Sequence, residues 1–195
     1  LTSLSKRVLK EKADFGIVVD PDVDRLAFVD ENGAVFGEEY TLVACSDYVL
    51  SKKPGNTVSN LSSTRALSEI TVKKGGTYHA SAVGEVNVVE KMKKVKAVIG
   101  GEGNGGIIYP DLHYGRDALV GVALFLSLLT EKNQKVSVLR ASYPDYAMSK
   151  AKISLSKEMD VDLIFKKVER KFSKNNIITI DGVKISFESS WVHLR

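Results

Sequence analysis

Apolar residues along the first three quarters of the chain follow two spacings in turn. Short apolar runs bounded by turn residues predict strands, and apolar positions three and four residues apart predict helices. Strands are expected at 15–19, 26–29, 57–60, 78–80 and 97–99. Helices are expected at 4–12, 40–50, 64–73, 86–94 and 116–130. Strands that alternate with helices in this way predict an α/β fold with a mainly parallel mixed sheet flanked by helices.

The pattern changes after about residue 146. Residues 160–172 carry apolar positions at helical spacing, and a hairpin turn sequence, Asp181-Gly182, follows. Strand-like runs are expected at 177–180, 183–187 and 191–194. A helix with antiparallel strands predicts a separate α+β unit. We therefore place a domain boundary near 145–150, and expect the chain to be a fragment, since it starts at Leu1 and stops within a strand-like run.

Composition adds little to this picture. Hydrophobic residues make up 44% of the chain, which is enough for a core. The single cysteine, Cys45, excludes an internal disulfide and fits a cytoplasmic protein. The longest apolar stretch is shorter than the roughly 20 residues of a membrane span, so no membrane partner is expected. The net charge of +4 suits anionic sugar phosphates. The lysines form no known nucleic-acid motif, so no nucleic-acid partner is expected.

An acidic loop lies between the first two expected strands. Asp20, Asp22 and Asp24 alternate there, and such close carboxylates repel one another unless a partner neutralises them. Hard divalent cations prefer oxygen ligands, so the loop is a candidate Mg²⁺ site. Glu31 stands where an EF-hand would need its last ligand, but Arg25 occupies the glycine position of such a loop, which excludes an EF-hand. A solvated acidic turn stays open as the alternative.

The run Asp20-Pro21-Asp22-Val23-Asp24-Arg25 resembles the metal-binding D-G-D-G-D-R loop of the α-D-phosphohexomutases. The resemblance implies that the three aspartates bind Mg²⁺ and that Arg25 contacts phosphate and the family's phosphoserine. Pro21 and Val23 replace two glycines of the family pattern. Because neither position supplies a ligand side chain, this departure affects the expected shape of the loop more than its chemistry.

A glycine-rich segment, residues 100–106, follows the strand expected at 97–99. It lacks both the G-x-x-x-x-G-K-[ST] and the G-x-G-x-x-G order. It offers Glu102 and Asn104, a carboxylate and an amide that can bind vicinal hydroxyls, although a glycine-rich turn without function is the alternative. The segment resembles the G-E-x-S-G sugar loop of the same family, which implies that Glu102 binds the 3- and 4-hydroxyls. Asn104 stands where serine is common.

Other candidate substrate contacts rest on the resemblance alone. They are Arg65, Glu85 and Arg116, for which surface ion pairing is an equal alternative, and Arg195, which resembles the first residue of a phosphate-binding loop. The resemblance also assigns 1–35 to the end of domain 2, 36–147 to the sugar-binding domain 3 and 148–195 to a truncated domain 4. No segment matches the family's T-x-S-H-N-P serine loop, so this chain by itself is expected to be inactive.

The family reaction interconverts hexose 1-phosphate and hexose 6-phosphate through a phosphoserine and a hexose 1,6-bisphosphate. The resemblance therefore implies an intramolecular phosphotransferase for glucose or mannose phosphate, with Mg²⁺ as cofactor and the missing domains of the same polypeptide as partners. A phosphoglucosamine mutase of the same family is one alternative. A non-catalytic divalent-cation module and a basic nucleic-acid domain are two others, of different classes.

Overall fold

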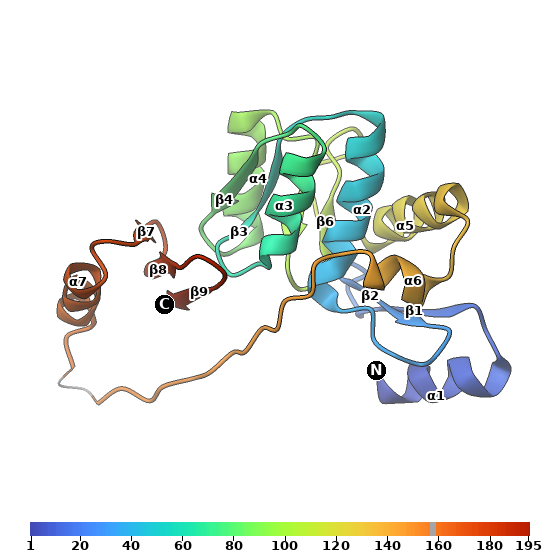
Figure 1. Cartoon of the computed structure of the whole chain (residues 1–195), viewed down its shortest axis with the longest axis horizontal. Coiled ribbons are helices and arrows are strands. Elements are labelled where there is room, and N and C mark those ends of the chain that lie inside the picture. Colours follow the sequence, from blue (N-terminus) through green and yellow to red (C-terminus); the bar gives the residue numbers. More distant parts are fainter. Residues whose placement is uncertain (157–158) are drawn as a thin grey trace. The chain divides into compact units, whose positions relative to one another are not determined.

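The computed structural model describes residues 1–156 and 159–195 (Figure 1). Leu1–Tyr146 and Ala147–Arg195 form two units. The elements of the first unit are α1 (Thr2–Glu11), β1 (Phe15–Val19), β2 (Leu26–Asp30), α2 (Glu38–Lys52), β3 (Thr57–Asn60), α3 (Arg65–Lys73), β4 (Tyr78–Ser81), α4 (Glu85–Val95), β5 (Ile99–Glu102), β6 (Gly106–Ile108), α5 (Ala118–Lys132) and α6 (Val136–Ala141). No helix in the described residues is long and apolar enough to cross a membrane.

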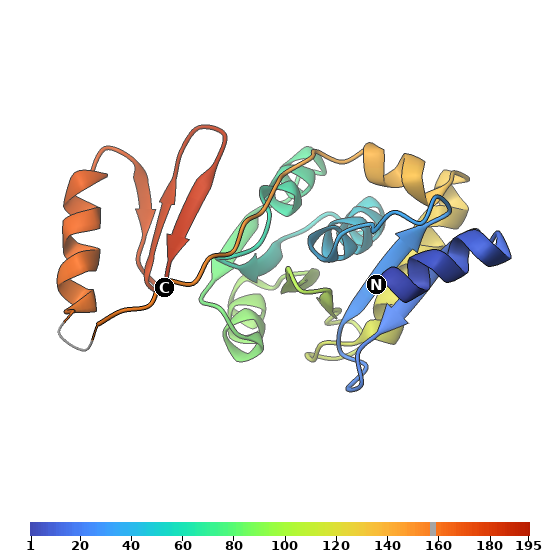
Figure 2. The ribbon, with the colours of Figure 1, turned by 90° about the horizontal axis from the view of Figure 1, so that it is seen from below.

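The central sheet of the first unit has the strand order β4-β3-β5-β6. The first three strands are parallel and β6 is antiparallel to β5. Helices α2, α3 and α5 share the larger core on one face, while α4 covers the other face with a smaller core (Figure 2). This arrangement confirms the α/β expectation. It also follows from physics, since parallel strands need crossover helices, which then cover both faces.

The strand pair that flanks the acidic loop belongs to the larger core. β1 and β2 form an antiparallel ribbon, and Phe28 on β2 stacks on Phe125 of α5 with ring centroids 3.8 Å apart. Phe36 meets Phe125 edge-on. All three rings are fully buried, and each such burial stabilises the fold by roughly 1.5–3 kcal/mol. The acidic loop is thus anchored to the unit that contains the central sheet.

The limits predicted for the strand at 97–99 were wrong. The observed β5 begins at Ile99 and runs through the glycines to Glu102, and β6 was not expected at all. At Gly100 a Cβ atom would lie 2.5 Å from Met92 Sδ and 2.8 Å from Val58 O. This glycine therefore permits close packing of α4 and β3 against β5. For that reason, most of the glycine-rich segment that the sequence suggested to be a loop forms strand.

The helix expected at 116–130 begins two residues later. Asp117 accepts a hydrogen bond from the Val120 amide at 3.0 Å and caps α5. Arg116 therefore lies outside the helix, in a β-bridge with Ile108. The short helix α6 was also missed, because six residues are too few to show helical periodicity.

The second unit consists of α7 (Val161–Lys171) and the antiparallel sheet β7 (Asn176–Ile178), β8 (Val183–Ser186) and β9 (Trp191–Leu194). Gly182 has φ +68° in the β7–β8 turn, a conformation that glycine adopts at little cost. The α+β pattern is confirmed. The assignment of 1–35, 36–147 and 148–195 to domains of a longer protein stays a prediction.

Candidate functional site

The acidic loop is folded around the carboxylate of Asp20. Asp20 Oδ1 accepts hydrogen bonds from the amides of Asp24 (3.1 Å) and Arg25 (3.2 Å). The Arg25 guanidinium lies beside both acids, with Nε 3.7 Å from Asp20 Oδ2 and 3.8 Å from Asp24 Oδ1. Val23, which replaces a family glycine, has φ +56°, a left-handed conformation that costs a non-glycine residue roughly 1–2 kcal/mol. Val23 thus holds a backbone conformation that glycine would adopt at lower cost.

The pKa values of Asp20 and Asp24, the first and last aspartates of this loop, shift in opposite directions. Burial raises the pKa of Asp24, and the neighbouring Asp20 carboxylate raises that pKa further. Burial also acts to raise the pKa of Asp20, but the hydrogen bonds from the Arg25 and Asp24 amides outweigh it, and this pKa is lowered. Asp20 therefore keeps its charge more readily than Asp24 does.

Glu102 at the end of β5 is only 5% exposed and is surrounded by donors. Its Oε1 accepts from Asn60 Nδ2 at 2.9 Å and from the Gly84 amide at 3.2 Å. Its Oε2 accepts from Arg116 Nη1 at 2.9 Å. A carboxylate can accept at about four positions, so in this arrangement the chain itself occupies three of them.

Arg116 joins the glycine-rich loop to the acidic loop. While Nη1 donates to Glu102, Nη2 donates to Asp24 Oδ2 at 2.5 Å. Its Nε lies 3.3 Å from Glu85 Oε2, an ion-pair contact without hydrogen-bond geometry. The backbone adds a link between the loops, because the Leu26 amide donates to the Gly105 carbonyl at 3.1 Å.

These residues meet at the carboxyl ends of the parallel strands. Asn60 ends β3, Glu102 ends β5, and Gly84 with Glu85 follows β4. Ligands of open α/β sheets bind at this edge. Asn60 and Gly84 were missed from the sequence. The position of Asn60 at the end of a buried strand could have indicated it. The Gly84 contact is made by a backbone amide, which no residue type in the sequence reveals.

The remaining predicted site residues have surroundings of their own. Asn104 Oδ1 accepts from the Gly106 amide within its own turn, and Asp22 is exposed. Arg65 is the first residue of α3. In the second unit, Arg195 pairs with Asp181 at 3.3 Å. Their predicted roles in substrate or metal binding stay predictions.

The carboxylate oxygens of the acidic loop are of the type that Mg²⁺ prefers as ligands. Asp24 Oδ1 is buried, and it has no hydrogen-bond partner in the described part of the chain, so it can accept a cation. Asp20 and Asp24 thus fit a divalent cation, and Asp22 is the third oxygen donor on the same loop. In residues 1–156 and 159–195, however, no three His, Cys, Asp or Glu side chains are gathered as a metal cluster. The Mg²⁺ site therefore stays a prediction.

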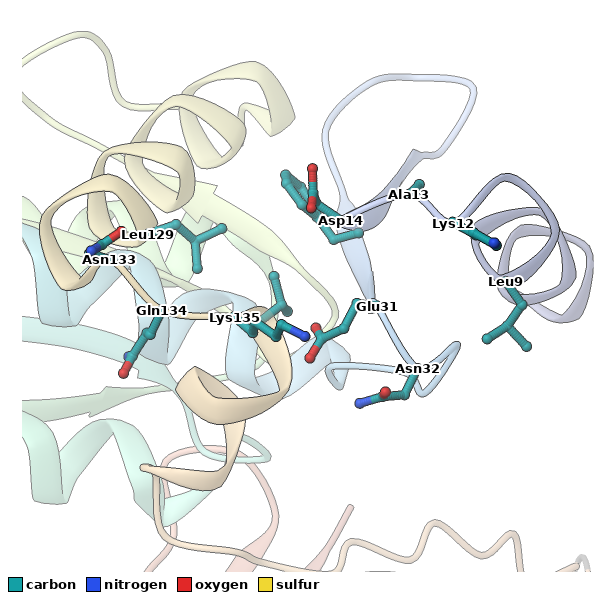
Figure 3. Close-up of a pocket in the computed structure, with 12 residues that line it drawn as sticks. Leu9, Lys12, Ala13, Asp14, Glu31, Asn32, Leu129, Asn133, Gln134 and Lys135 are labelled. Atoms are coloured by element: carbon teal, nitrogen blue, oxygen red, sulfur yellow. The ribbon is translucent and has the colours of Figure 1, made fainter.

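A cavity of about 690 Å³ lies between α1, the start of β1, the end of α5 and the start of α6 (Figure 3). None of the predicted site residues lines it. Glu31, on its wall near Lys135, accepts a hydrogen bond from the Ser137 amide at 3.2 Å and so caps α6. Glu31 is thus engaged as a helix cap, in agreement with the exclusion of an EF-hand.

Comparison with known proteins places this chain in a family. The α/β/α domain III of phosphoglucomutase/phosphomannomutase matches residues 37–146. A probable phosphoglucosamine mutase from Methanopyrus kandleri is 31% identical over 198 residues, covering 100% of this chain and 44% of that protein. The phosphoglucomutase/phosphomannomutase of Thermococcus kodakarensis is 33% identical over 186 residues, covering 94% of this chain and 40% of that protein.

A solved structure agrees with the sequence relatives. The crystal structure of a phosphoglucomutase/phosphomannomutase family protein from Burkholderia thailandensis superposes with a TM-score of 0.83 at 26% identity. The match covers 98% of this chain and 41% of that one. The chain thus spans less than half the length of these relatives. It belongs to the α-D-phosphohexomutase family and contains that family's domain III.

Proposed function

We propose that this chain is the central part of a mutase that interconverts hexose 1-phosphate and hexose 6-phosphate. One observation carries the proposal. The acidic loop and the glycine-rich loop, which the sequence singled out separately, meet at one guanidinium, with Asp24 on one side and Glu102 on the other. A cation site and a hydroxyl-binding carboxylate at one edge of a parallel sheet suit a phosphorylated sugar.

The reaction is two phosphoryl transfers. A phosphoserine in the rest of the protein transfers its phosphoryl group to a hydroxyl oxygen of the sugar, which forms the 1,6-bisphosphate. The bisphosphate then reorients in the site. Its other phosphoryl group is transferred to the serine, which is phosphorylated again. Arg25 would offset charge on the transferring group, and Mg²⁺ bound by Asp20, Asp22 and Asp24 would supply further positive charge there. Arg195 would contact the second phosphate.

The sugar must be held in two orientations. Glu102 and Asn104 would bind hydroxyls, which both orientations present, and Arg65 and Glu85 would flank them. Glu102→Ala in the complete protein should therefore lower kcat/KM with the 1-phosphate and with the 6-phosphate. Loss of a charge-assisted hydrogen bond of about 1.5–3 kcal/mol corresponds to about a tenfold to hundredfold decrease. An unchanged kcat/KM for both substrates would remove Glu102 from the sugar site.

The sugar itself has three candidates. Relatives of similar identity are named phosphoglucosamine mutase and phosphoglucomutase/phosphomannomutase, which supports glucosamine phosphate as much as glucose or mannose phosphate. These sugars differ at C2. Steady-state kinetics of the complete protein with the 1-phosphates of glucose, mannose and glucosamine, each with its 1,6-bisphosphate and Mg²⁺, would rank them by kcat/KM. Turnover of none of the three would refute the proposed function.

A further inference from the structure

We propose that Arg116 is a positioning residue that fixes the acidic loop and the glycine-rich loop relative to each other, instead of a substrate contact. The contacts of Arg116 stand by themselves. Their expected effect on Mg²⁺ binding rests on the proposed function. Arg116 lies between two segments that are far apart in sequence, the loop after β1 and the turn after β5.

Every nitrogen of the Arg116 guanidinium lies near a carboxylate of the chain, and two of them donate hydrogen bonds. Its three nitrogens face Asp24 Oδ2 at 2.5 Å, Glu102 Oε2 at 2.9 Å and Glu85 Oε2 at 3.3 Å. Its side chain is 14% exposed. Its nearest charged partners are thus three carboxylates of the chain, which favours a role between loops over a role in phosphate binding.

The backbone of Arg116 is also held in place. Its amide donates to Glu85 Oε1 at 2.9 Å, and the residue forms a β-bridge with Ile108. A Cβ atom at Gly106 would collide with the Cδ atom of Arg116, so the glycine leaves room for the side chain. The backbone of Arg116 is therefore fixed on both sides of its side chain.

Arginine suits this task for two reasons. Its planar fork can donate to two carboxylates at once in fixed directions, which a lysine ammonium on a flexible stem does not do. Its charge also separates Asp24, Glu85 and Glu102, which would repel one another without it. Without Arg116, we expect the two loops to move apart.

The orientation of Asp24 follows from the same contact. Arg116 binds Oδ2, and Oδ1 remains buried without a hydrogen-bond partner among the described residues. Arg116 thus holds one oxygen of Asp24 and leaves the other, 3.8 Å from Arg25 Nε, as the candidate metal ligand. Partners of this kind, which bind a metal ligand and not the metal, typically change metal affinity by about 10–100-fold when they are removed.

Hydrogen exchange of the 195-residue chain tests the contacts without any metal. In Arg116→Met, the Gly84 amide, which donates to Glu102 Oε1, should exchange about tenfold faster or more, since Glu102 loses its contact with Arg116. The amides of Asp24 and Arg25, which donate to Asp20 Oδ1, should also exchange faster, since their loop loses its link through Asp24. Amides within α3 should be unaffected. Arg140→Met is the matched control, because Arg140 is also partly buried and ion-paired, at 23% exposure. Unchanged exchange at all three amides in Arg116→Met would overturn the proposal.

Calorimetric titration of the same variants with Mg²⁺ tests the consequence. Arg116→Met should weaken binding by about 10–100-fold and Arg116→Lys by less, while Arg140→Met should bind like the wild type. Mg²⁺ binding that is equal or tighter in Arg116→Met would show that charge repulsion outweighs positioning and would overturn the inference. Wild-type Mg²⁺ affinity in Arg116→Lys would show that the guanidinium fork is not needed, and it would also overturn the inference. If the wild-type chain binds no Mg²⁺, the metal site of the proposed function falls, and hydrogen exchange alone decides the role of Arg116.

Discussion

Replacement of Glu102 by glutamine tests whether the buried carboxylate organises the site. All three contacts of Glu102 are donors, namely Asn60 Nδ2, the Gly84 amide and Arg116 Nη1. A carboxylate presents acceptors on both oxygens. The amide of glutamine presents one acceptor and one NH₂ donor, so in Glu102→Gln at least one donor faces another donor inside the protein.

The size of the effect follows from these contacts. A hydrogen bond to a charged group contributes about 1.5–3 kcal/mol, and a buried donor left without an acceptor costs about 1–3 kcal/mol. Relief of repulsion among the neighbouring carboxylates offsets part of this loss. We therefore expect Glu102→Gln to lower the free energy of unfolding of the first unit by about 2–3 kcal/mol.

Two probes distinguish the units in urea unfolding. Trp191 is the only tryptophan and lies on β9 of the second unit, so its fluorescence reports that unit, while circular dichroism at 222 nm reports both. With a slope of about 1–3 kcal/mol per M, Glu102→Gln should move the circular-dichroism midpoint by about 1–3 M. The fluorescence midpoint should stay in place.

Glu90→Gln on the exposed face of α4 is the control, and surface changes of this kind are usually within about 0.5 kcal/mol of the wild type. A Glu102→Gln transition that coincides with that of the control would refute the reasoning, because it would mean that the donors around Glu102 need no second acceptor oxygen.

Three further predictions address the metal, the packing and a helix cap. Asp22→Asn should weaken Mg²⁺ binding to the chain in calorimetry, because a charged oxygen ligand is lost; an unchanged affinity would remove Asp22 from the metal site. Gly100→Ala should destabilise the first unit by about 1–3 kcal/mol in urea unfolding, since the added Cβ meets Met92 Sδ at 2.5 Å; a neutral result would show that this contact relaxes freely. Burial acts to raise the pKa of Asp117, but the Val120 amide and His113 lower it below its ordinary value of 3.8. The ionised Asp117 therefore stabilises the fold above about pH 4, and this stabilisation is lost as the pH falls through its lowered folded pKa. Asp117→Ala should thus lower the free energy of unfolding by about 0.5–2 kcal/mol at pH 7 and by less near pH 2.

Local patterns determined most of the fold of this chain. The alternation of apolar runs and helical stripes predicted the strands β1 to β4, the helices α2 to α4 and the separate α+β pattern after residue 146. Such patterns are sufficient because each element is defined by neighbours a few positions away. They failed at β5 and β6, where glycines permit close packing that no local spacing reveals.

The candidate residues were also visible in the sequence, because carboxylates and amides in short loops are chemically conspicuous. Their arrangement was decided by the tertiary structure. Asp24 and Glu102 are far apart along the chain and meet only through Arg116, whose position depends on where α5 begins and on the bridge to Ile108. Asn60 and the Gly84 amide join the site because parallel strands bring their carboxyl ends to one edge of the sheet. Contacts of this kind depend on the packing of distant elements, and the sequence by itself does not encode them in any local pattern.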